Sequence, residues 1–230
     1  MQTTEFISLG GNCSVAYQLH KRGLRDVGYP FDWSKSSMNQ LISALEDKLA
    51  KYVSSLEISE FSNNHPYIKI CGPLPNQSDN ILQNQGTYKC RNDYGITMSH
   101  ELVIKDDLTT IKGKLSRRVH RFLTLGNSER EILHFIRVEM KIVTPDNYIF
   151  KLVRLVNMLL DIIDNTKSVK LSLIFHSSNS GMYEYIQDNC YLQELISNGC
   201  LDIKCHYYSH FSADWTMPQV DWDDVFKDKI

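Results

Sequence analysis

Strands and helices alternate along the second half of the chain, and this order limits the possible folds more than any other feature of the sequence. Strands are predicted at residues 132–138, 169–175 and 201–208, and helices at 107–125, 146–165 and 182–197. A strand followed by a helix and then by another strand forms a right-handed crossover, which makes the two strands parallel. We therefore expect a single α/β domain over residues 1–230, with a mainly parallel sheet and helices on both faces.

The first half of the chain contributes one more strand and two helices. A short apolar run at residues 5–9 is followed by a helix at 13–22 that Gly23 ends, and a helix of about 18 residues begins after Ser34 or Ser36. Residues 55–100 contain turn-forming Asn, Pro and Gly between short strand candidates. This stretch is predicted to be an irregular insertion.

Composition restricts the class of protein. The 230 residues carry a net charge of −2 and 42% of them are hydrophobic, which is typical of a globular protein and argues against a nucleic-acid-binding one. The longest apolar runs, at 152–163 and 169–175, are interrupted by charged residues, so we expect no membrane span and no signal peptide. The spacing of the six cysteines matches no disulfide framework or zinc site. We therefore expect reduced thiols in a cytoplasmic protein without a cofactor.

The turn between the first strand and the first helix reads Gly10-Gly11-Asn12-Cys13, and such strand-to-helix turns are where α/β proteins bind ligands. Asn12 is a typical helix N-cap. A helix N-terminus favours the thiolate form of a cysteine, which is the nucleophilic form. The N–H groups that follow Gly11, together with the Asn12 side chain, are placed to stabilise an oxyanion. The alternative is that Cys13 packs as a small apolar side chain.

Several segments resemble a known family. Residues 8–16 (Ser-Leu-Gly-Gly-Asn-Cys-Ser-Val-Ala) and 29–33 (Tyr-Pro-Phe-Asp-Trp) carry the most specific likeness, and weaker matches extend it to about residue 140. The family consists of uncharacterised proteins of bacteria and large viruses and is described as putative papain-like cysteine peptidases. The resemblance implies a nucleophilic Cys13, a base at His100 and, in place of a parallel sheet, a papain-like α+β fold. Glu101 stands where the family has Asp.

A cysteine hydrolase needs a base within hydrogen-bond reach of the thiol and a group that orients this base. His176 is an alternative to the base that the resemblance implies, because it follows a predicted strand and so reaches the same sheet edge as Cys13. Asp32 is the candidate orienting group, since a carboxylate between two aromatic residues is expected to lie in a partly dry pocket. Alternatively, the aromatic residues anchor the loop and Asp32 only caps the next helix.

Basic residues gather on the helix at 107–125, where Arg117 and Arg121 lie one turn apart, and Arg137 ends the next strand. Such a cluster is usually a solvated helix face. Arginines directed at the sheet edge would instead bind a phosphate or a carboxylate, each through two hydrogen bonds.

Cys205, His206 and His210 suggest a metal site, but they lie in or beside a predicted strand. Residues four apart on a strand are separated by about 13 Å, which is too far for shared metal ligands. The sequence therefore predicts no metal site.

Two functions follow from these patterns. The first is a cysteine-dependent hydrolase, of peptidase or acyl transferase type, with Cys13 as nucleophile, His100 as base and Asp32 as orienting group. The second is a nucleotide-sugar or phosphate-binding protein, such as a metal-independent glycosyltransferase, whose ligand is held by the three arginines named above. The partner is a peptide or a small molecule, containing phosphate in the second case, and neither nucleic acid nor a membrane. The resemblance favours the hydrolase.

Overall fold

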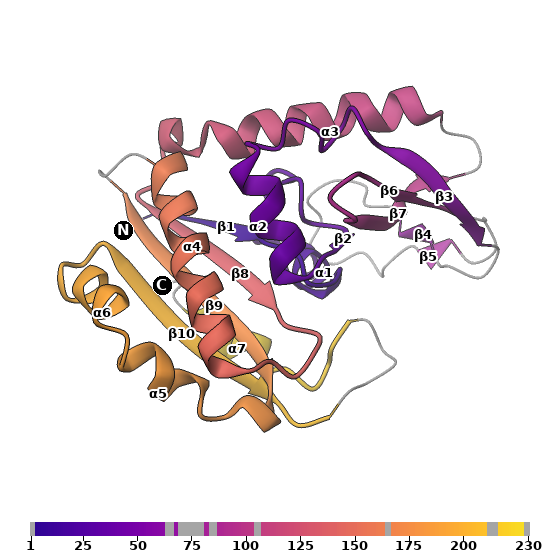
Figure 1. The fold of residues 1–230 in the computed structure, drawn as a ribbon. Helices are drawn as coiled ribbons and strands as arrows, with labels where there is room; N and C mark the ends of the chain where they lie inside the picture. Colours follow the sequence, from indigo (N-terminus) through magenta and orange to yellow (C-terminus); the bar gives the residue numbers. More distant parts are fainter. Residues whose placement is uncertain are drawn as a thin grey trace.

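Four parallel strands form the sheet at the centre of the molecule (Figure 1). The structure, a computed structural model, describes residues 3–62, 67–68, 81–82, 87–103, 107–163, 167–210 and 216–227, with the backbone alone at 61–62, 67–68, 81–82, 87 and 100–103. The strand order is β1 (Thr4–Ser8), β8 (Ile132–Val138), β9 (Ser168–His176) and β10 (Leu201–Tyr208). Each neighbouring pair is parallel, so the predicted α/β sheet is confirmed, and the sheet is not the antiparallel one of a papain-like fold.

Alternate side chains of this sheet enter two separate cores. On β8, Leu133 and Phe135 face one core, and Ile136 and Val138 face the other. The first core is covered by α2 (Met38–Glu46), α3 (Leu108–Leu123), α4 (Pro145–Ile162), α5 (Met182–Gln187) and α6 (Cys190–Ser197). The second is covered by α1 (Ser14–Lys21) and α7 (Trp222–Val225), which lies behind the sheet in Figure 1. Helices therefore cover both faces, as expected.

The position of α3 to α6 on one face follows from the strand order. Each successive strand is added on the same side of the one before it, from β1 to β10. Right-handed crossovers that all step in one direction place their helices on the same face of the sheet.

The segment predicted to be an irregular insertion contributes three strands to a second, antiparallel sheet, whose fourth strand, at residues 34–35, precedes that segment in the chain. Its strand order is β2 (Ser34–Lys35), β7 (Thr97–Val103), β6 (Thr87–Arg91) and β3 (Glu57–Ser62). A separate pair is formed by β4 (Tyr67–Ile68) and β5 (Ile81–Leu82). Cys90 of β6 pairs with Met98 of β7, and both side chains are buried in the larger core. The partners of β2 and β3 are distant in sequence, which local periodicity does not detect.

Two helix predictions differ from the structure in length. The helix predicted to run for about 18 residues is α2, which has nine. It ends because Lys48 and Leu49 adopt positive φ angles of 45° and 59°, outside the helical region. Its N-cap is Ser37, which forms a capping box with Gln40. The helix predicted at 182–197 is interrupted at Asn189, whose side chain caps α6 by accepting a hydrogen bond from the N–H of Leu192.

Among the helices in the described part of the chain, none is both long and apolar enough to cross a membrane.

Candidate functional site

The turn after β1 brings the first strand against the end of β8. Gly10 and Gly11 both have positive φ angles, of 77° and 92°. A Cβ atom on Gly11 would lie 1.9 Å from the carbonyl oxygen of Val138, a separation that no side chain permits. Only glycine can therefore stand at position 11 in this turn. The N–H of Gly11 donates to Ser36 Oγ at 3.4 Å, which links the turn to the segment before α2.

Cys13 is the N-cap of α1, one position later than the Asn12 cap that the sequence predicted. The residue is 9% exposed and packs in a cluster with Ala16, Tyr17 and Trp33. Asn12 still serves the helix end, because its Oδ1 accepts a hydrogen bond of 3.0 Å from the N–H of Ser14. The cysteine therefore lies at a helix N-terminus directly after a strand of the parallel sheet, as expected.

The other end of the Asn12 side chain faces the second core. Its Nδ2 lies 3.1 Å from the sulfur atoms of both Met140 and Met217. The amide is buried and so joins α1 to the loop after β8 and to the C-terminal segment. An oxyanion role for Asn12 and Gly11 stays a prediction.

Asp32 is buried, with 1% of the residue exposed, as the sequence predicted for a carboxylate between aromatic residues. Its Oδ2 accepts two hydrogen bonds, from Arg25 Nη2 at 2.6 Å and from the N–H of Tyr29 at 2.7 Å. Oδ1 takes part in neither bond. The guanidinium of Arg25 also lies over the Trp33 ring, 5.7 Å from its centre. The loop that precedes β2 is thus held by a buried ion pair beside the aromatic cluster that contains Cys13.

The antiparallel sheet brings the strand that carries His100 to this region. Ser34 pairs with Met98 and Lys35 with Thr97. The two strands run in opposite directions. From Met98 to His100, β7 therefore extends toward the end of β2 at which Trp33 precedes Ser34. The backbone of His100 and the cluster around Cys13 therefore lie at the same end of β2. The side chains of His100 and Glu101 are outside the described residues.

His176, the alternative base, ends β9 at the same edge of the parallel sheet as Cys13, but β8 lies between β9 and β1. Its Nδ1 accepts a hydrogen bond from the N–H of Ser178 at 3.1 Å. The ring stacks edge-on against Tyr208, with 5.4 Å between ring centres. These contacts orient His176 within the β9–β10 edge of the sheet.

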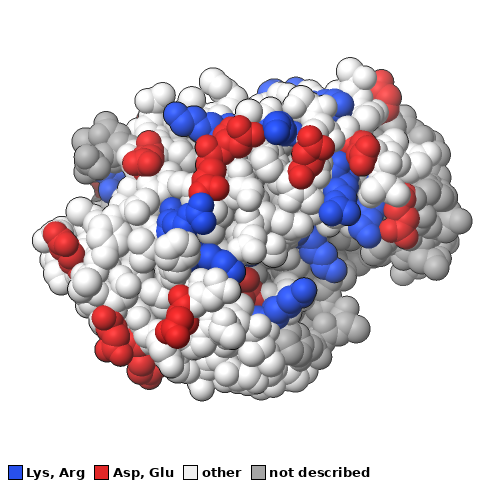
Figure 2. Space-filling view, in the orientation of Figure 1, with Lys and Arg blue, Asp and Glu red and all other residues white. Residues whose placement is uncertain are grey.

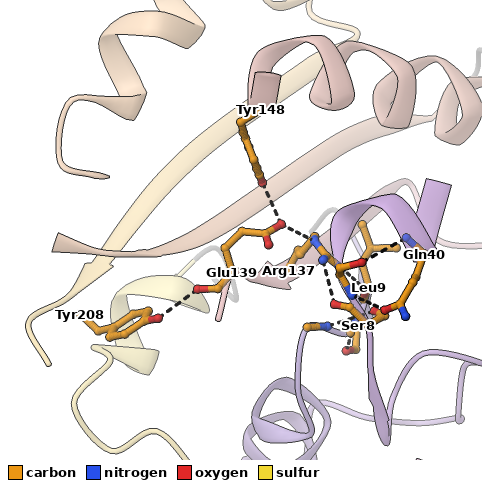
Figure 3. A network of polar contacts seen from close by, with 11 residues as sticks. Ser8, Leu9, Gln40, Arg137, Glu139, Tyr148 and Tyr208 are labelled. Atoms are coloured by element: carbon orange, nitrogen blue, oxygen red, sulfur yellow. Dashed lines mark hydrogen bonds and ion pairs between the residues drawn. The ribbon is translucent and has the colours of Figure 1, made fainter. Parts of the chain in front are cut away.

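Arg137 lies at the centre of a buried polar network (Figure 3). Its Nη1 donates to the carbonyl of Leu9 at 2.9 Å and its Nη2 to the carbonyl of Ser36 at 3.0 Å. Its Nε donates to Glu139 Oε1 at 2.5 Å, and no part of the Arg137 side chain is exposed. The guanidinium thus joins β8, the turn after β1 and the segment before α2.

Glu139 and Tyr148 complete this network, and sequence reasoning missed both. The Tyr148 hydroxyl donates to Glu139 Oε1 at 3.2 Å. Burial and the nearby Glu139 carboxylate raise the pKa of Tyr148 well above its usual value, so the hydroxyl keeps its proton. One signal was present: Glu139 lies two residues after Arg137, which places both on the same side of an extended chain.

The arginines of the predicted clamp lie in two places, with Arg117 and Arg121 one turn apart on α3 and Arg137 in the buried network. Arg117 is exposed on α3. Arg121 Nη1 donates to the carbonyl of Gly28 at 2.9 Å, and burial and the neighbouring Arg118 lower the pKa of Arg121. Arg137 contacts Leu9 and Ser36, as described above. The structure does not bring Arg117, Arg121 and Arg137 together around one ligand position.

His206, one of the residues that suggest a metal site in the sequence, lies on β10 between two polar neighbours. Its Nδ1 is 3.0 Å from Asp224 Oδ2, and its Nε2 is 3.4 Å from Ser172 Oγ. His210 lies beyond the end of β10. Within the ranges that the structure describes, no group of three or more His, Cys, Asp or Glu side chains could hold a metal ion.

The burial of His206 predicts a pH-dependent stability. Burial lowers the pKa of His206, and Asp224 offsets this in part, while Lys204 and Lys227 add to it. The imidazole of His206 therefore binds a proton more tightly in the unfolded chain than in the folded one. The stability that the neutral, buried imidazole contributes is lost as the pH falls below about 6.5, the pKa of an ordinary histidine. Urea unfolding at pH 7.5 and at pH 5.5 is expected to show a smaller loss of stability in His206→Gln than in the parent protein. An equal loss in both proteins would contradict this assignment.

Comparisons with known proteins identify a family and one relative. Residues 4–178 match the family described as "Putative papain-like cysteine peptidase (DUF1796)". "Uncharacterized protein R408" of Acanthamoeba polyphaga mimivirus is 30% identical over an alignment of 196 residues, and the alignment covers 80% of this chain and 82% of that protein. No solved structure gives a significant match. The family match includes Cys13, Asp32 and His100 and extends from β1 to the end of β9.

Proposed function

The chain belongs to the family described as "Putative papain-like cysteine peptidase (DUF1796)", and from this premise we propose that it is a cysteine-dependent hydrolase with Cys13 as its nucleophile. One observation carries the proposal. Cys13 begins α1 directly after β1 and packs with Trp33, next to the β2 strand that pairs with β7, the strand of His100. The pairing of β2 with β7 thus brings the backbone of His100, which follows Cys13 by 87 positions, to the region of the thiol.

The reaction requires a proton acceptor and a stabilised thiolate. The N–H groups of the first turn and the positive end of the dipole at the start of α1 favour the thiolate of Cys13. In the proposed step the imidazole of His100 takes the thiol proton, and the sulfur attacks the acyl carbon of the substrate. The leaving group receives that proton, and water then hydrolyses the thioester.

Asp32 is proposed to orient the base. Its Oδ2 is held by Arg25 and by the backbone of Tyr29, which fixes the carboxylate on the loop just before β2. Oδ1 is not engaged in these two bonds and serves as the acceptor for an imidazole N–H. The placement of Asp32 beside Trp33 puts this carboxylate next to the cluster that contains Cys13.

Alkylation of the thiols by iodoacetamide tests the nucleophile. Cys13 is expected to react with an apparent pKa below about 8.5, the value of an ordinary thiol, and His100→Ala is expected to raise it. Mass spectrometry of tryptic peptides reads each cysteine separately, and exposed Cys190 and Cys200 serve as reference thiols. Burial raises the pKa of Cys205 to about 12, so this thiol is expected to stay unmodified near neutral pH.

The pH midpoint of alkylation, and not its absolute rate, decides the outcome, because Cys13 is only 9% exposed. A midpoint for Cys13 at or above that of the reference thiols, unchanged in His100→Ala, would exclude the Cys13–His100 pair. Cleavage of a fluorogenic peptide library provides the second measurement, and Cys13→Ala is expected to abolish it.

A further inference from the structure

A cavity of about 740 Å³ lies at the carboxyl end of the parallel sheet, between the first turns of α2 and α4. Gly11, which follows β1, and Glu139, which follows β8, lie at its base. Figure 2 shows this face of the molecule hollowed between the two helices. The carboxyl end of a parallel sheet is the usual ligand position in α/β proteins, and the volume is that of a small-molecule site.

The walls of this pocket are positively charged. Lys35, Lys141 and Lys151 line it from three different segments, and Figure 2 shows blue side chains on both sides of the hollow. Glu139 is the acidic residue among the described lining residues, and its carboxylate is already bonded to the buried guanidinium of Arg137. The three lysines therefore face the cavity with their charge uncompensated by the lining, which favours a ligand with more than one negative charge.

The first turn of α4 adds backbone donors. Thr144 is the N-cap of this helix of 18 residues, and no side chain in the described part of the chain caps it. Thr144 and Asn147 line the pocket, whereas the acidic Asp146 does not. Pro145 has no N–H and the N–H of Tyr148 donates to the carbonyl of Thr144 at 3.0 Å, so the donors of this turn are the N–H groups of Asp146 and Asn147, which lack partners within the helix.

Part of the cavity lining is apolar. Met38, Met140, Ile142 and Val143 line it, and Ile142 is 59% exposed. An exposed isoleucine beside a charged pocket is a surface that a ligand with an apolar part would cover. The lining thus combines lysines and backbone donors for an anion with an apolar wall for an organic group.

From these observations we propose that the pocket binds an organic phosphate, with the phosphate between Lys35, Lys141 and Lys151 and the organic part against Met38, Met140 and Ile142. Cys13 is not among the lining residues, so this site is separate from the proposed nucleophile. The proposal goes beyond the hydrolase function and stands without it.

Isothermal titration of the full chain with ADP, UDP, pyrophosphate and uridine tests the proposal. The two nucleoside diphosphates are expected to bind saturably, pyrophosphate more weakly and uridine not at all. The triple variant K35Q/K141Q/K151Q is expected to bind the diphosphates at least about tenfold more weakly, because three charge-assisted contacts are lost. The triple variant K35R/K141R/K151R, which keeps the charge, is expected to bind within a few-fold of the parent protein.

The matched control is K21Q/K48Q/K51Q, which removes the same charge from exposed lysines outside the pocket. It is expected to leave the affinity within about twofold of the parent value, since these exposed lysines do not line the pocket and their charges are screened by water and salt. Equal weakening in both glutamine variants would mean diffuse charge attraction and would overturn the site. Absence of binding by both nucleoside diphosphates would overturn it as well. Thermal unfolding of each variant verifies that the fold is retained.

Discussion

Gly11→Ala is expected to destabilise the protein by roughly 2–6 kcal/mol, or to prevent folding, because two separate costs add at this position. The backbone has a φ of 92°, which an alanine adopts only with strain. The new Cβ would also lie 1.9 Å from the carbonyl oxygen of Val138, and this neighbour is backbone that cannot rotate away. The strand β8 would have to move away from the turn that leads to Cys13.

Gly199→Ala is the matched control for this experiment. Gly199 also has a positive φ, of 72°, but nothing lies within 4 Å of the Cβ that alanine would add. Its cost is therefore the backbone strain alone, about 1–2 kcal/mol. Urea unfolding followed by circular dichroism compares the two variants. If Gly11→Ala cost no more than Gly199→Ala, the close approach of the turn to β8 would be refuted.

Arg137→Met is expected to cost about 3–5 kcal/mol, because it removes one partner of a buried ion pair and leaves the other charge in place. The substitution deletes the donors to Glu139 Oε1 and to the carbonyls of Leu9 and Ser36. Methionine replaces the apolar stem of arginine and lacks the guanidinium, so the loss reports mainly the missing hydrogen bonds and charge. The effect is expected in the unfolding free energy from urea titration.

A double variant separates the charge from the packing. Arg137→Met combined with Glu139→Gln removes the uncompensated carboxylate and is expected to recover part of the lost stability. Arg117→Ala is the control for arginine loss in general, and it is expected to change stability by less than about 0.5 kcal/mol because Arg117 is exposed. If Arg137→Met behaved like Arg117→Ala, the network in Figure 3 would contribute nothing to the fold.

The parallel sheet could be predicted from the sequence because its strands are buried on both faces. Every residue of β8 is buried, and its sequence from Ile132 to Val138 is apolar except for His134 and Arg137, so the mainly apolar run coincides with the strand. The turn with Gly10 and Gly11 and the cysteine after it were predicted for a similarly local reason. Positive φ angles and a helix start leave their mark within a few residues.

The antiparallel sheet could not be predicted in this way. Residues 34–35 pair with residues 97–98, and residues 57–62 pair with 87–91, so each strand is stabilised by a partner far away in the chain. Short strands of this kind gain their stability from cross-strand neighbours and not from their own composition. The proximity of the strand of His100 to Cys13 depends on this pairing, and therefore it emerged only in three dimensions.

The role of Arg137 was also decided by the tertiary structure. An arginine at the end of a strand is a plausible anion ligand in the sequence, where nothing tells which groups will surround it. In the folded chain the carbonyls of Leu9 and Ser36 and the carboxylate of Glu139 lie around its guanidinium. The lysines of the proposed phosphate pocket come from β2, from the loop after β8 and from α4. Local sequence determined the strands and the glycine turn through backbone preferences and apolar periodicity, whereas the surroundings of each charged side chain depended on segments that only folding brings together.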